Sequence, residues 1–327
     1  MSTEASTDLK ALYLSIEPEL ARLEEFLERE FRGEDRFIVR LFDHVRQYRG
    51  KQIRPALLLM VAKLGRGDIS DDQIKIAAVV EMIHTATLVH DDILDDARLR
   101  RNVETLHRRW GERVAVLMGD FIYSRAFYLS TQVPGMASVL SNATNLICEG
   151  ELLQIRSRYE PGISEEEYFE LIRKKTAILY AVACELGGRL SGFEASECPQ
   201  LRRFGLELGM AFQIIDDCID YAGEEEVVGK SLGTDLHQGK VTLPLIYLLK
   251  MLSPDEAAAL GEDLGRPLTA DAERSIAAEV RERGALRAAQ QRAEEFVHSA
   301  KAHLGELPLS MREGLEMMAD YVLRRRH

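Results

Sequence analysis

The chain has 327 residues, of which 46% are hydrophobic, and this is enough apolar material for a large core in one domain or at most two. Its formal charge of −12 argues against nucleic acid as a partner, since no basic stripe is present to release counterions. No apolar run is long enough to cross a bilayer, and the first residues lack the pattern of a signal peptide. The cysteines show no CxxC spacing, so we expect reduced core thiols in a cytoplasmic protein, at Cys148, Cys184, Cys198 and Cys218.

Apolar residues recur at helical spacing almost throughout, and no alternating run of five or more residues predicts a strand. The spacing predicts an amphipathic helix over 8–30 and another from Pro55 to about Lys63, because proline is tolerated in the first turn of a helix. Ser70 before two aspartates is typical of an N-cap, and it opens a long helix over about 71–95. Further helices are predicted at 112–131, 136–158, 164–190 and 199–221, which makes the fold class all-α.

The remainder of the chain divides into one irregular segment and a helical tail. Residues 222–239 are acidic and then rich in glycine, and a long loop of this kind beside a site is often a lid. Residues 253–325 read as amphipathic helices without a chemical motif, so we expect them to serve packing and the surface. No repeat or low-complexity linker divides the sequence, which predicts a single domain over 1–327.

Two aspartate clusters of the same pattern lie about 125 residues apart, at 91–95 and at 216–220. Both lie in apolar, helix-compatible stretches, where unpaired carboxylates are rare because burying a charge is costly. The first and last aspartates of each cluster are one helical turn apart and share a face. Two such faces, opposed across a cavity, would bind several Mg²⁺ ions, with substrate phosphates completing the shells. The pattern therefore indicates chemistry on a diphosphate, against the alternative that each cluster is only a charged surface patch.

Basic residues accompany both clusters in short, specific contexts. His84 lies on the same helix face as Asp91 and Asp95, which favours a role toward a ligand over that of a core histidine. Arginine suits phosphate oxygens because its guanidinium binds them in a bidentate manner. Taken singly, each lysine is more often a solvated surface residue. The candidate basic residues are Lys51 and Arg54 at a helix start, Arg100 and Arg101 after the first cluster, Lys175 within a helix, and Lys230 and Lys240 in the glycine-rich loop.

Seven motifs in order resemble those of the trans-polyprenyl diphosphate synthase family, over roughly residues 35–250. They are Gly50-Lys51-x-x-Arg54-Pro55; Glu81-x-x-His84 running to Asp91-Asp92-x-x-Asp95 and Arg100-Arg101; Gly119-Asp120-Phe121; Glu149-Gly150-Glu151; Lys175-Thr176-Ala177; Phe212-Gln213-x-x-Asp216-Asp217-x-x-Asp220; and the loop from Gly229-Lys230 to Gly239-Lys240 and Pro244. Asn102 stands where the family usually has glycine, and Arg49 and Gln52 flank Lys51 where glycine and arginine are common. No charged ligand is lost.

The resemblance implies a helical bundle around a central cavity, the type I isoprenoid synthase fold, and a homodimer. It implies a Mg²⁺-dependent enzyme that condenses isopentenyl diphosphate with an allylic diphosphate. The expected metal ligands are Asp91, Asp92, Asp95, Asp216, Asp217 and Asp220, with Arg100, Lys175, Lys230 and Lys240 assisting on the allylic diphosphate. Lys51, Arg54, His84 and Arg101 would hold isopentenyl diphosphate, while Thr176 and Gln213 would face the reacting region. The catalytic group is expected to comprise Asp91, Asp95, Asp216, Lys175 and Lys230.

Two other functions fit parts of the sequence. A class I terpene cyclase would share the fold, but it needs no isopentenyl site, and Lys51, Arg54 and Arg101 are all present. A metal phosphohydrolase of the HD type would use His84 with the pair His90-Asp91. That chemistry gathers histidine and aspartate from several helices, whereas the second cluster here is all aspartate.

The residues upstream of the first cluster carry a prediction about product length. In family members that stop early, bulky aromatics directly before the first aspartate close the tunnel for the growing chain. Here the tunnel would run past Thr87, Ala86, Ile83 and Val80, none of them aromatic, toward a floor that the next helix could supply through Phe121, Phe127 or Tyr128. Because one helical turn adds about 5.4 Å, roughly one isoprenoid unit, we expect a product of roughly thirty to fifty carbons.

Overall fold

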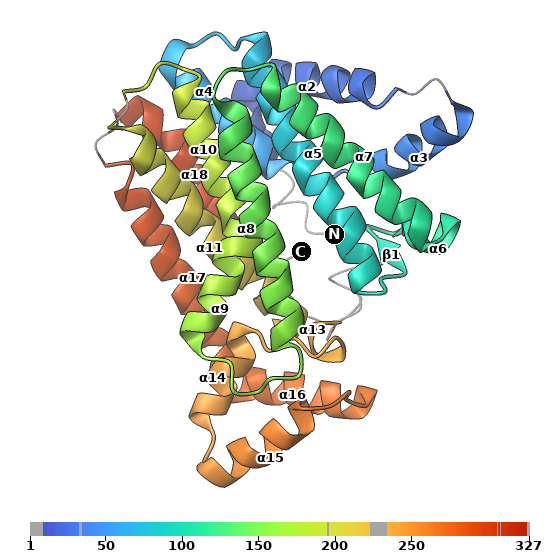
Figure 1. The fold of residues 1–327 in the computed structure, drawn as a ribbon. Helices are drawn as coiled ribbons and strands as arrows, with labels where there is room; N and C mark the ends of the chain where they lie inside the picture. The colour runs from blue at the N-terminus through green and yellow to red at the C-terminus, as the bar shows by residue number, and fades with distance from the viewer. Residues whose placement is uncertain are drawn as a thin grey trace. The chain divides into compact units, whose positions relative to one another are not determined.

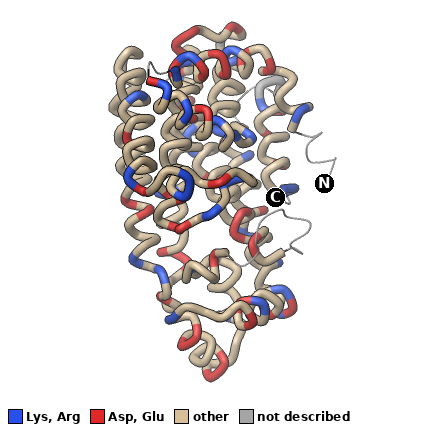
Figure 2. Tube along the Cα trace, turned by 90° about the vertical axis from the view of Figure 1, so that its right-hand side faces the viewer, with Lys and Arg blue, Asp and Glu red and all other residues tan. Residues whose placement is uncertain are grey.

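The computed structural model describes residues 9–32, 35–194, 196–222, 234–305, 307 and 309–325. Almost all regular structure in these ranges is helical, and this confirms the all-α class (Figure 1). The exception is a two-stranded antiparallel hairpin of β1 (Leu99–Arg100) and β2 (Val103–Glu104). Lys and Arg are interspersed with Asp and Glu along the helices (Figure 2). Within the described ranges, no helix combines the length and apolarity that a membrane span needs.

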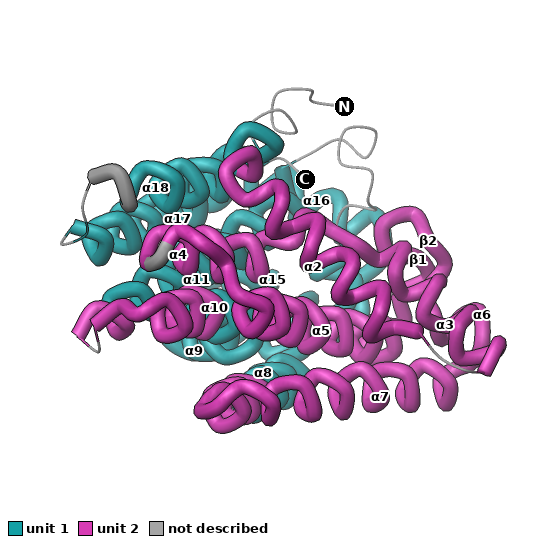
Figure 3. The backbone as a smooth tube through the Cα atoms, turned by 90° about the horizontal axis from the view of Figure 1, so that it is seen from above, with its two compact units in different colours: residues 1–12, 145–181, 200–327 teal, residues 13–144, 182–199 magenta. Residues whose placement is uncertain are grey.

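The chain forms two compact units, which we describe one at a time (Figure 3). Unit 2 comprises Tyr13–Thr144 and Val182–Pro199, and unit 1 comprises Met1–Leu12, Asn145–Ala181 and Gln200–His327. Two long helices, α8 (Met136–Ser157) and α10 (Ile178–Arg189), each contribute residues to both units. The expectation of a single domain over the whole chain stays a prediction.

Unit 2 is built around α5, whose apolar residues point in every direction. This helix spans Asp71–Leu94, and it packs against α7 (Glu112–Thr131), α4 (Ile53–Arg66) and α2 (Glu17–Glu30). A helix that is apolar all round belongs in a core rather than at a surface. Ser70 opens α5 with a capping box, in which its hydroxyl accepts from the Gln73 amide N–H while the Gln73 side chain accepts from the Ser70 N–H. The predicted N-cap is therefore confirmed.

The other elements of unit 2 are η1 (Leu14–Ile16), α3 (Arg36–Arg46), the hairpin and α6 (Leu106–Trp110). The hairpin turn consists of Arg101 and Asn102, both with positive φ, at 52° and 65°. Two left-handed residues make the tight turn that matches the twist of a hairpin, and asparagine adopts this conformation readily. This explains why Asn102 can replace the usual glycine.

Unit 1 collects the helices that follow in the chain. They are α9 (Glu165–Ile172), η2 (Arg173–Ala177), α11 (Cys198–Ala222), α13 (Thr234–His237), α14 (Leu243–Met251), α15 (Pro254–Leu264), α16 (Ala270–Glu282), α17 (Ala285–Ala302) and α18 (Leu309–Arg324). Buried alanines recur along α17, at 285, 289, 293 and 300, and these small side chains let α14, α16 and α18 pack closely against it. The helix predicted over 164–190 is not regular, because η2 is a π-helical turn between α9 and α10.

Candidate active site

The first aspartate cluster lies at the C-terminal end of α5. Asp91 and Asp92 belong to the last turn, Asp95 is the C-cap, and that turn contains no basic residue. The C-terminus of a helix carries a partial negative charge, so three carboxylates there repel the helix as well as one another. The end of α5 is therefore a place where cations bind favourably.

The three carboxylates differ in their surroundings. Asp92 is only 1% exposed, and its Oδ1 accepts from Arg100 Nε at 2.8 Å. Burial raises the pKa of the Asp92 carboxyl, and the Arg100 guanidinium opposes that rise. Asp91 and Asp95 are half-buried instead. The first and last aspartates of the cluster therefore differ in burial from the second, Asp92, which is buried and paired with Arg100.

Basic residues from three parts of unit 2 converge on His84. Burial lowers the pKa of this imidazole well below 6.5, and the charges of Arg54 and Arg101 lower it further. Arg100 contributes in the same direction, so His84 is neutral at physiological pH. Arg100 is already paired with Asp92, and Arg54 and Arg101 bring two further guanidinium groups toward the neutral imidazole. This set of donors suits a polyanion.

The loop before α4 holds Arg101 in place. Arg101 donates from Nη1 to the Tyr48 carbonyl, and a Cβ at Gly50 would overlap its guanidinium. The Lys51 carbonyl accepts from the Tyr13 hydroxyl at 2.6 Å, which ties this loop to the start of unit 2. Lys51 precedes α4 and Arg54 lies in its first turn, as the sequence predicted. The predicted isopentenyl residues Arg54, His84 and Arg101 are brought together.

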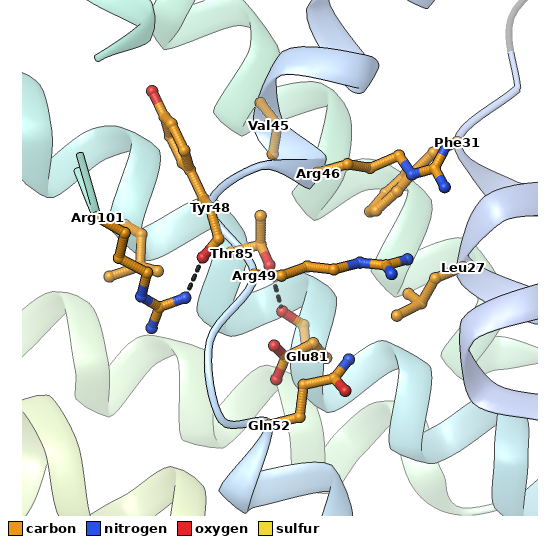
Figure 4. A pocket seen from close by; sticks show the side chains of 11 residues that line it. Leu27, Phe31, Val45, Arg46, Tyr48, Arg49, Gln52, Glu81, Thr85 and Arg101 are labelled. Carbon is orange, nitrogen blue, oxygen red and sulfur yellow. Dashed lines mark hydrogen bonds between the residues drawn. The ribbon is translucent and has the colours of Figure 1, made fainter. Parts of the chain in front are cut away.

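A small pocket lies beside this basic cluster, between α2, α3 and α5 (Figure 4). Its volume of about 30 Å³ is room for one or two waters and not for a substrate. The arginines that line it are already bound, Arg46 to Glu28 and Arg49 to Glu24. Glu81 and Arg101 also line this pocket, so it adjoins the basic cluster around His84.

The residues predicted to set chain length lie mainly in the core of unit 2. Val80, Ile83 and Ala86 are fully buried, and the Thr87 hydroxyl donates to the His84 carbonyl at 2.7 Å. Gly119 lets α7 approach the His90 ring. His90, Tyr123 and Phe127 then form an aromatic row along α7, with ring centres 5.9 and 6.2 Å apart. Tyr128 and Phe121 are exposed and lie outside this row.

The second aspartate cluster lies near the end of α11 in unit 1. The Asp217 carboxylate is buried and accepts from the Tyr168 hydroxyl at 2.6 Å and from Gln213 Nε2 at 2.7 Å. Burial raises the pKa of Asp217 to about 7, and the neighbouring Asp216 adds to that rise. Asp220 accepts from the Thr234 hydroxyl and from the Asp235 amide, at 3.0 and 2.9 Å.

The lysines of unit 1 are placed by glutamates and by a π-helical turn. Lys175 and Thr176 belong to η2, and such turns are frequent at functional sites. Lys175 binds Glu151 and Gln154 of α8, while the Thr176 hydroxyl donates to Gln213 Oε1 at 2.7 Å. Thr176 and Gln213 are thus brought together. Lys240 lies 4.0 Å from Asp235, and its charge lowers the pKa of Asp217. Lys230 lies outside the described residues.

The carboxylates of the two clusters suit a divalent metal ion that is bound jointly by the protein and the substrate. Among the described residues, no group of three or more histidine, cysteine or acidic side chains is gathered closely enough to hold an ion alone. Mg²⁺ is usually bound by one or two carboxylates, and phosphate oxygens and water fill the other positions. The half-buried Asp91, Asp95 and Asp216 offer such carboxylates.

Sequence reasoning missed two residues of the site and misplaced one cysteine. Tyr168 lacked any motif, and its role follows only from the hydrogen bond that its hydroxyl donates to Asp217. Arg325 belongs to the tail that was expected to serve packing and surface, yet its Nη2 donates to Asp216 Oδ1 at 2.7 Å, because the end of α18 reaches α11. The basic run that ends the sequence was the available signal. Cys148 is exposed and not a core residue, whereas the other three cysteines are buried.

Comparisons with known proteins add an independent line of evidence. The family model described as "Polyprenyl synthetase" matches residues 35–280. The octaprenyl diphosphate synthase of Escherichia coli K12 is 38% identical over 84% of this chain and 86% of that protein. A short chain isoprenyl diphosphate synthase of Methanothermobacter thermautotrophicus is also 38% identical, over 89% of this chain and 91% of that protein.

A solved structure agrees over nearly the whole chain. The polyprenyl synthase of Caulobacter crescentus CB15 superposes with a TM-score of 0.92 at 36% identity, covering 98% of both chains. That protein was crystallised with calcium and isoprenyl diphosphate. The similarity includes both segments that carry an aspartate cluster.

Proposed function

Since this chain belongs to the polyprenyl synthetase family and is a prenyltransferase, we propose that it is a trans-polyprenyl diphosphate synthase. We further propose that its activity depends on Mg²⁺. The enzyme would join isopentenyl diphosphate to an allylic diphosphate. The observation that carries this assignment is the packing of Arg101 against the Tyr48–Gly50 loop, directly before Lys51 and Arg54 at the start of α4. The charges of Arg54, Arg100 and Arg101 act on the buried His84 and lower its pKa. A terpene cyclase has no use for this second anion site. An HD-type phosphohydrolase would need His84 as a metal ligand, and the nearby guanidinium charges disfavour a cation there because like charges repel.

The isopentenyl diphosphate site is assigned to unit 2. Arg54 and Arg101 are proposed to donate to the diphosphate oxygens. Lys51 adds a further positive charge just before the N-terminus of α4. His84 stays neutral and donates one N–H. Burial raises the pKa of Glu81, and the charges of Arg54 and Arg101 oppose that rise. Glu81 is therefore the acidic residue that faces these two arginines.

The allylic diphosphate is assigned to the carboxylates and the cations around them. Asp91, Asp95 and Asp216 are the proposed metal ligands, and Asp92, Asp217 and Asp220 complete the clusters. When bound, Mg²⁺ supplies charge that stabilises the departing diphosphate. Arg100, Lys175 and Lys240 hold phosphate oxygens, and Lys230 is proposed for the same role from the sequence alone.

The reaction needs no protein nucleophile. Thr176 and Gln213 are bound to each other at 2.7 Å, and their polar groups are proposed to face the reacting carbons. The double bond of isopentenyl diphosphate attacks the allylic carbon, the bond to diphosphate breaks, and one proton leaves the product. The departing diphosphate accepts that proton, so the chain's own task is to position both substrates and exclude water.

Product length is proposed from the residues beside α5. Small or aliphatic side chains at 80, 83, 86 and 87 leave no aromatic barrier directly before Asp91, which favours a product of roughly thirty to fifty carbons. Relatives of equal identity carry names of different chain length, so similarity alone does not decide it.

We also propose that the protein is a single-domain enzyme that acts in the cytoplasm as a homodimer. The four cysteines are free thiols, which suits a reducing compartment. Large apolar side chains are exposed along α7 of unit 2, at Val116, Leu117, Phe121 and Tyr128. These positions follow helical spacing, and an exposed apolar stripe of this kind is typical of a subunit interface.

One assay tests the reaction directly. Radiolabelled isopentenyl diphosphate is incubated with dimethylallyl, geranyl or farnesyl diphosphate and Mg²⁺, and the products are separated by chain length. We expect labelled, extended all-trans chains. Phosphate release without extension would support the hydrolase, and an unlabelled cyclic hydrocarbon would support the cyclase.

A further inference from the structure

Arg325 follows α18 directly, and its side chain lies against the second aspartate cluster within unit 1. Nη2 donates to Asp216 Oδ1 at 2.7 Å, and the guanidinium carbon is 3.8 Å from the centre of the Phe212 ring. Phe212 and Asp216 are one turn apart on α11, so one guanidinium contacts both through an ion pair and a cation–π interaction. Arg325, directly after α18, is thereby held on a proposed metal ligand.

The contact between Arg325 and Asp216 is shielded from solvent on the side of the guanidinium. The Arg325 side chain is only 7% exposed, whereas Asp216 is 36% exposed. Among the described residues, Nε and Nη1 of Arg325 are buried without a hydrogen-bond partner. A guanidinium tolerates such a position only where an opposite charge compensates for the lost hydration. Asp216 is that charge.

A second basic residue, Lys240, lies near the cluster, and its effect is on the neighbouring aspartate. Lys240 acts on Asp217, whose carboxylate already accepts from Tyr168 and Gln213. Asp216 and Asp217 are adjacent carboxylates, and the charge of the first raises the pKa of the second. Arg325 therefore supplies a countercharge for Asp216 within the protein.

We propose that Arg325 is an internal counter-ion that competes with the divalent cation for Asp216. A metal ion beside the bound guanidinium would place like charges within a few ångströms of each other, so the two occupants exclude each other. Because such coupling is reciprocal, binding of metal releases the end of α18, and removal of Arg325 strengthens binding of metal. This inference rests on the proposed metal role of Asp216.

The test uses the full chain and Mn²⁺ as the probe, with and without inorganic pyrophosphate. Binding is measured by isothermal titration calorimetry and by the electron paramagnetic resonance signal of free Mn²⁺. The Arg325→Gln variant is expected to bind Mn²⁺ about three- to tenfold more tightly than the unmodified protein, as suits a partly exposed ion pair. Arg324→Gln, which removes the same charge from the exposed neighbouring residue, is the matched control and is expected to leave the affinity unchanged.

The outcomes separate this inference from the proposed function. Equal Mn²⁺ affinity in Arg325→Gln and the unmodified protein would overturn the competition. Weaker binding in the presence of pyrophosphate would overturn it as well, since Arg325 would then be a ligand of the diphosphate. Adding Asp216→Asn to Arg325→Gln is expected to abolish the gain. If Asp216→Asn alone leaves Mn²⁺ binding intact, the metal assignment of Asp216 fails instead.

Discussion

The carboxylates of the two clusters are of two kinds, and the same division occurs in both units. The second aspartate of each cluster is buried and already bound, Asp92 by Arg100 and Asp217 by Tyr168 and Gln213. The first aspartate of each cluster is half-buried, and Asp216 also accepts from Arg325 at its partly exposed position. Successive residues of a helix are rotated by about 100°, so the second aspartate necessarily points away from the face of the first. The repeated motif therefore buries the second aspartate and leaves the first and the last partly exposed.

Replacement of the first aspartates should remove activity without removing the fold. We expect Asp91→Ala or Asp216→Ala to lower kcat by at least about a hundredfold, because each loses a charge that acts on the departing diphosphate. Removing one of several like charges relieves repulsion, so the thermal stability of metal-free Asp91→Ala should be kept or raised. Asp216→Ala also unpairs the buried Arg325 guanidinium, so its thermal stability should be lower, with the fold retained. Steady-state kinetics at saturating Mg²⁺ and a thermal melt measure the two effects. Near-normal turnover in either variant would refute the assignment.

The basic residues of unit 2 give a second expectation at this scale. Lys51→Ala and Arg101→Ala should raise the KM for isopentenyl diphosphate much more than the KM for the allylic primer. A charge-assisted contact contributes about 1.5–3 kcal/mol, which corresponds to roughly ten- to a hundredfold. Each KM is measured at saturating concentration of the other substrate. Equal effects on both substrates would mean that the two diphosphate sites are assigned wrongly.

At the scale of elements, the long helices could be predicted from the sequence and the short ones could not. The predictions for α5, α7, α8 and α11 end within about one residue of the observed bounds, because each has a long apolar pattern and clear ends. The shorter α3, α6 and α14 were missed, as was the hairpin. Strands of two residues leave no alternating pattern to read.

The candidate site was predictable to the same extent. Residues in local motifs, such as Arg54 and His84, could be found because helical spacing and residue type are visible in the sequence. Tyr168 and Arg325 act through contacts across 49 and 109 positions of sequence, which no local pattern encodes. The division of the aspartates into buried and half-buried kinds also required the structure, since it depends on what packs beside each helix.

The contact between α8 and η2 can be tested with a glycine. A Cβ at Gly150 would lie 2.5 Å from the Lys175 backbone nitrogen, and the backbone would have to move. We expect Gly150→Ala to destabilise the protein by about 1–3 kcal/mol through overpacking, outweighing the gain of about 1 kcal/mol in helix propensity. Gly261→Ala, in α15, meets its nearest atoms at 3.8 Å and is the control, expected to be neutral or stabilising. Denaturant unfolding compares the two. Similar stability of both variants would contradict the close approach.

The face of α5 before Asp91 can be tested with a bulky residue. Ala86 is fully buried, and Ala86→Phe should shorten the product by overfilling the proposed tunnel near its mouth. The chain lengths of radiolabelled products, separated by reversed-phase chromatography, give the result. If the unmodified enzyme already stops at about fifteen carbons, or if the variant leaves the product distribution unchanged, the tunnel lies elsewhere.

At the scale of the whole molecule, the exposed stripe on α7 is the proposed interface of the homodimer. We expect Leu117→Glu to convert the proposed homodimer to monomers at micromolar concentration, since a buried unpaired charge at an interface is costly. Sedimentation velocity measures the molar mass. Leu14→Glu is a matched control, because Leu14 and Leu117 are both 67% exposed but Leu14 lies in η1, away from the stripe. A dimer that survives Leu117→Glu would rule out this face.

The π-helical turn of η2 has a consequence for how the chain can change. Its hydrogen bonds reach one residue further than those of an α-helix, so the segment over 173–177 holds one residue more than a regular helix would need there. Deleting that residue would restore regular α-helical geometry. The wide turn already absorbs the extra residue, so α9 and α10 would keep their relative rotation, but the side chains within the turn would point in new directions. Lys175 and Thr176 would then leave their partners on α8 and α11 together. In this segment the number of residues is as strongly constrained as the identity of the side chains. We therefore expect insertions and deletions here to be tolerated less well than substitutions.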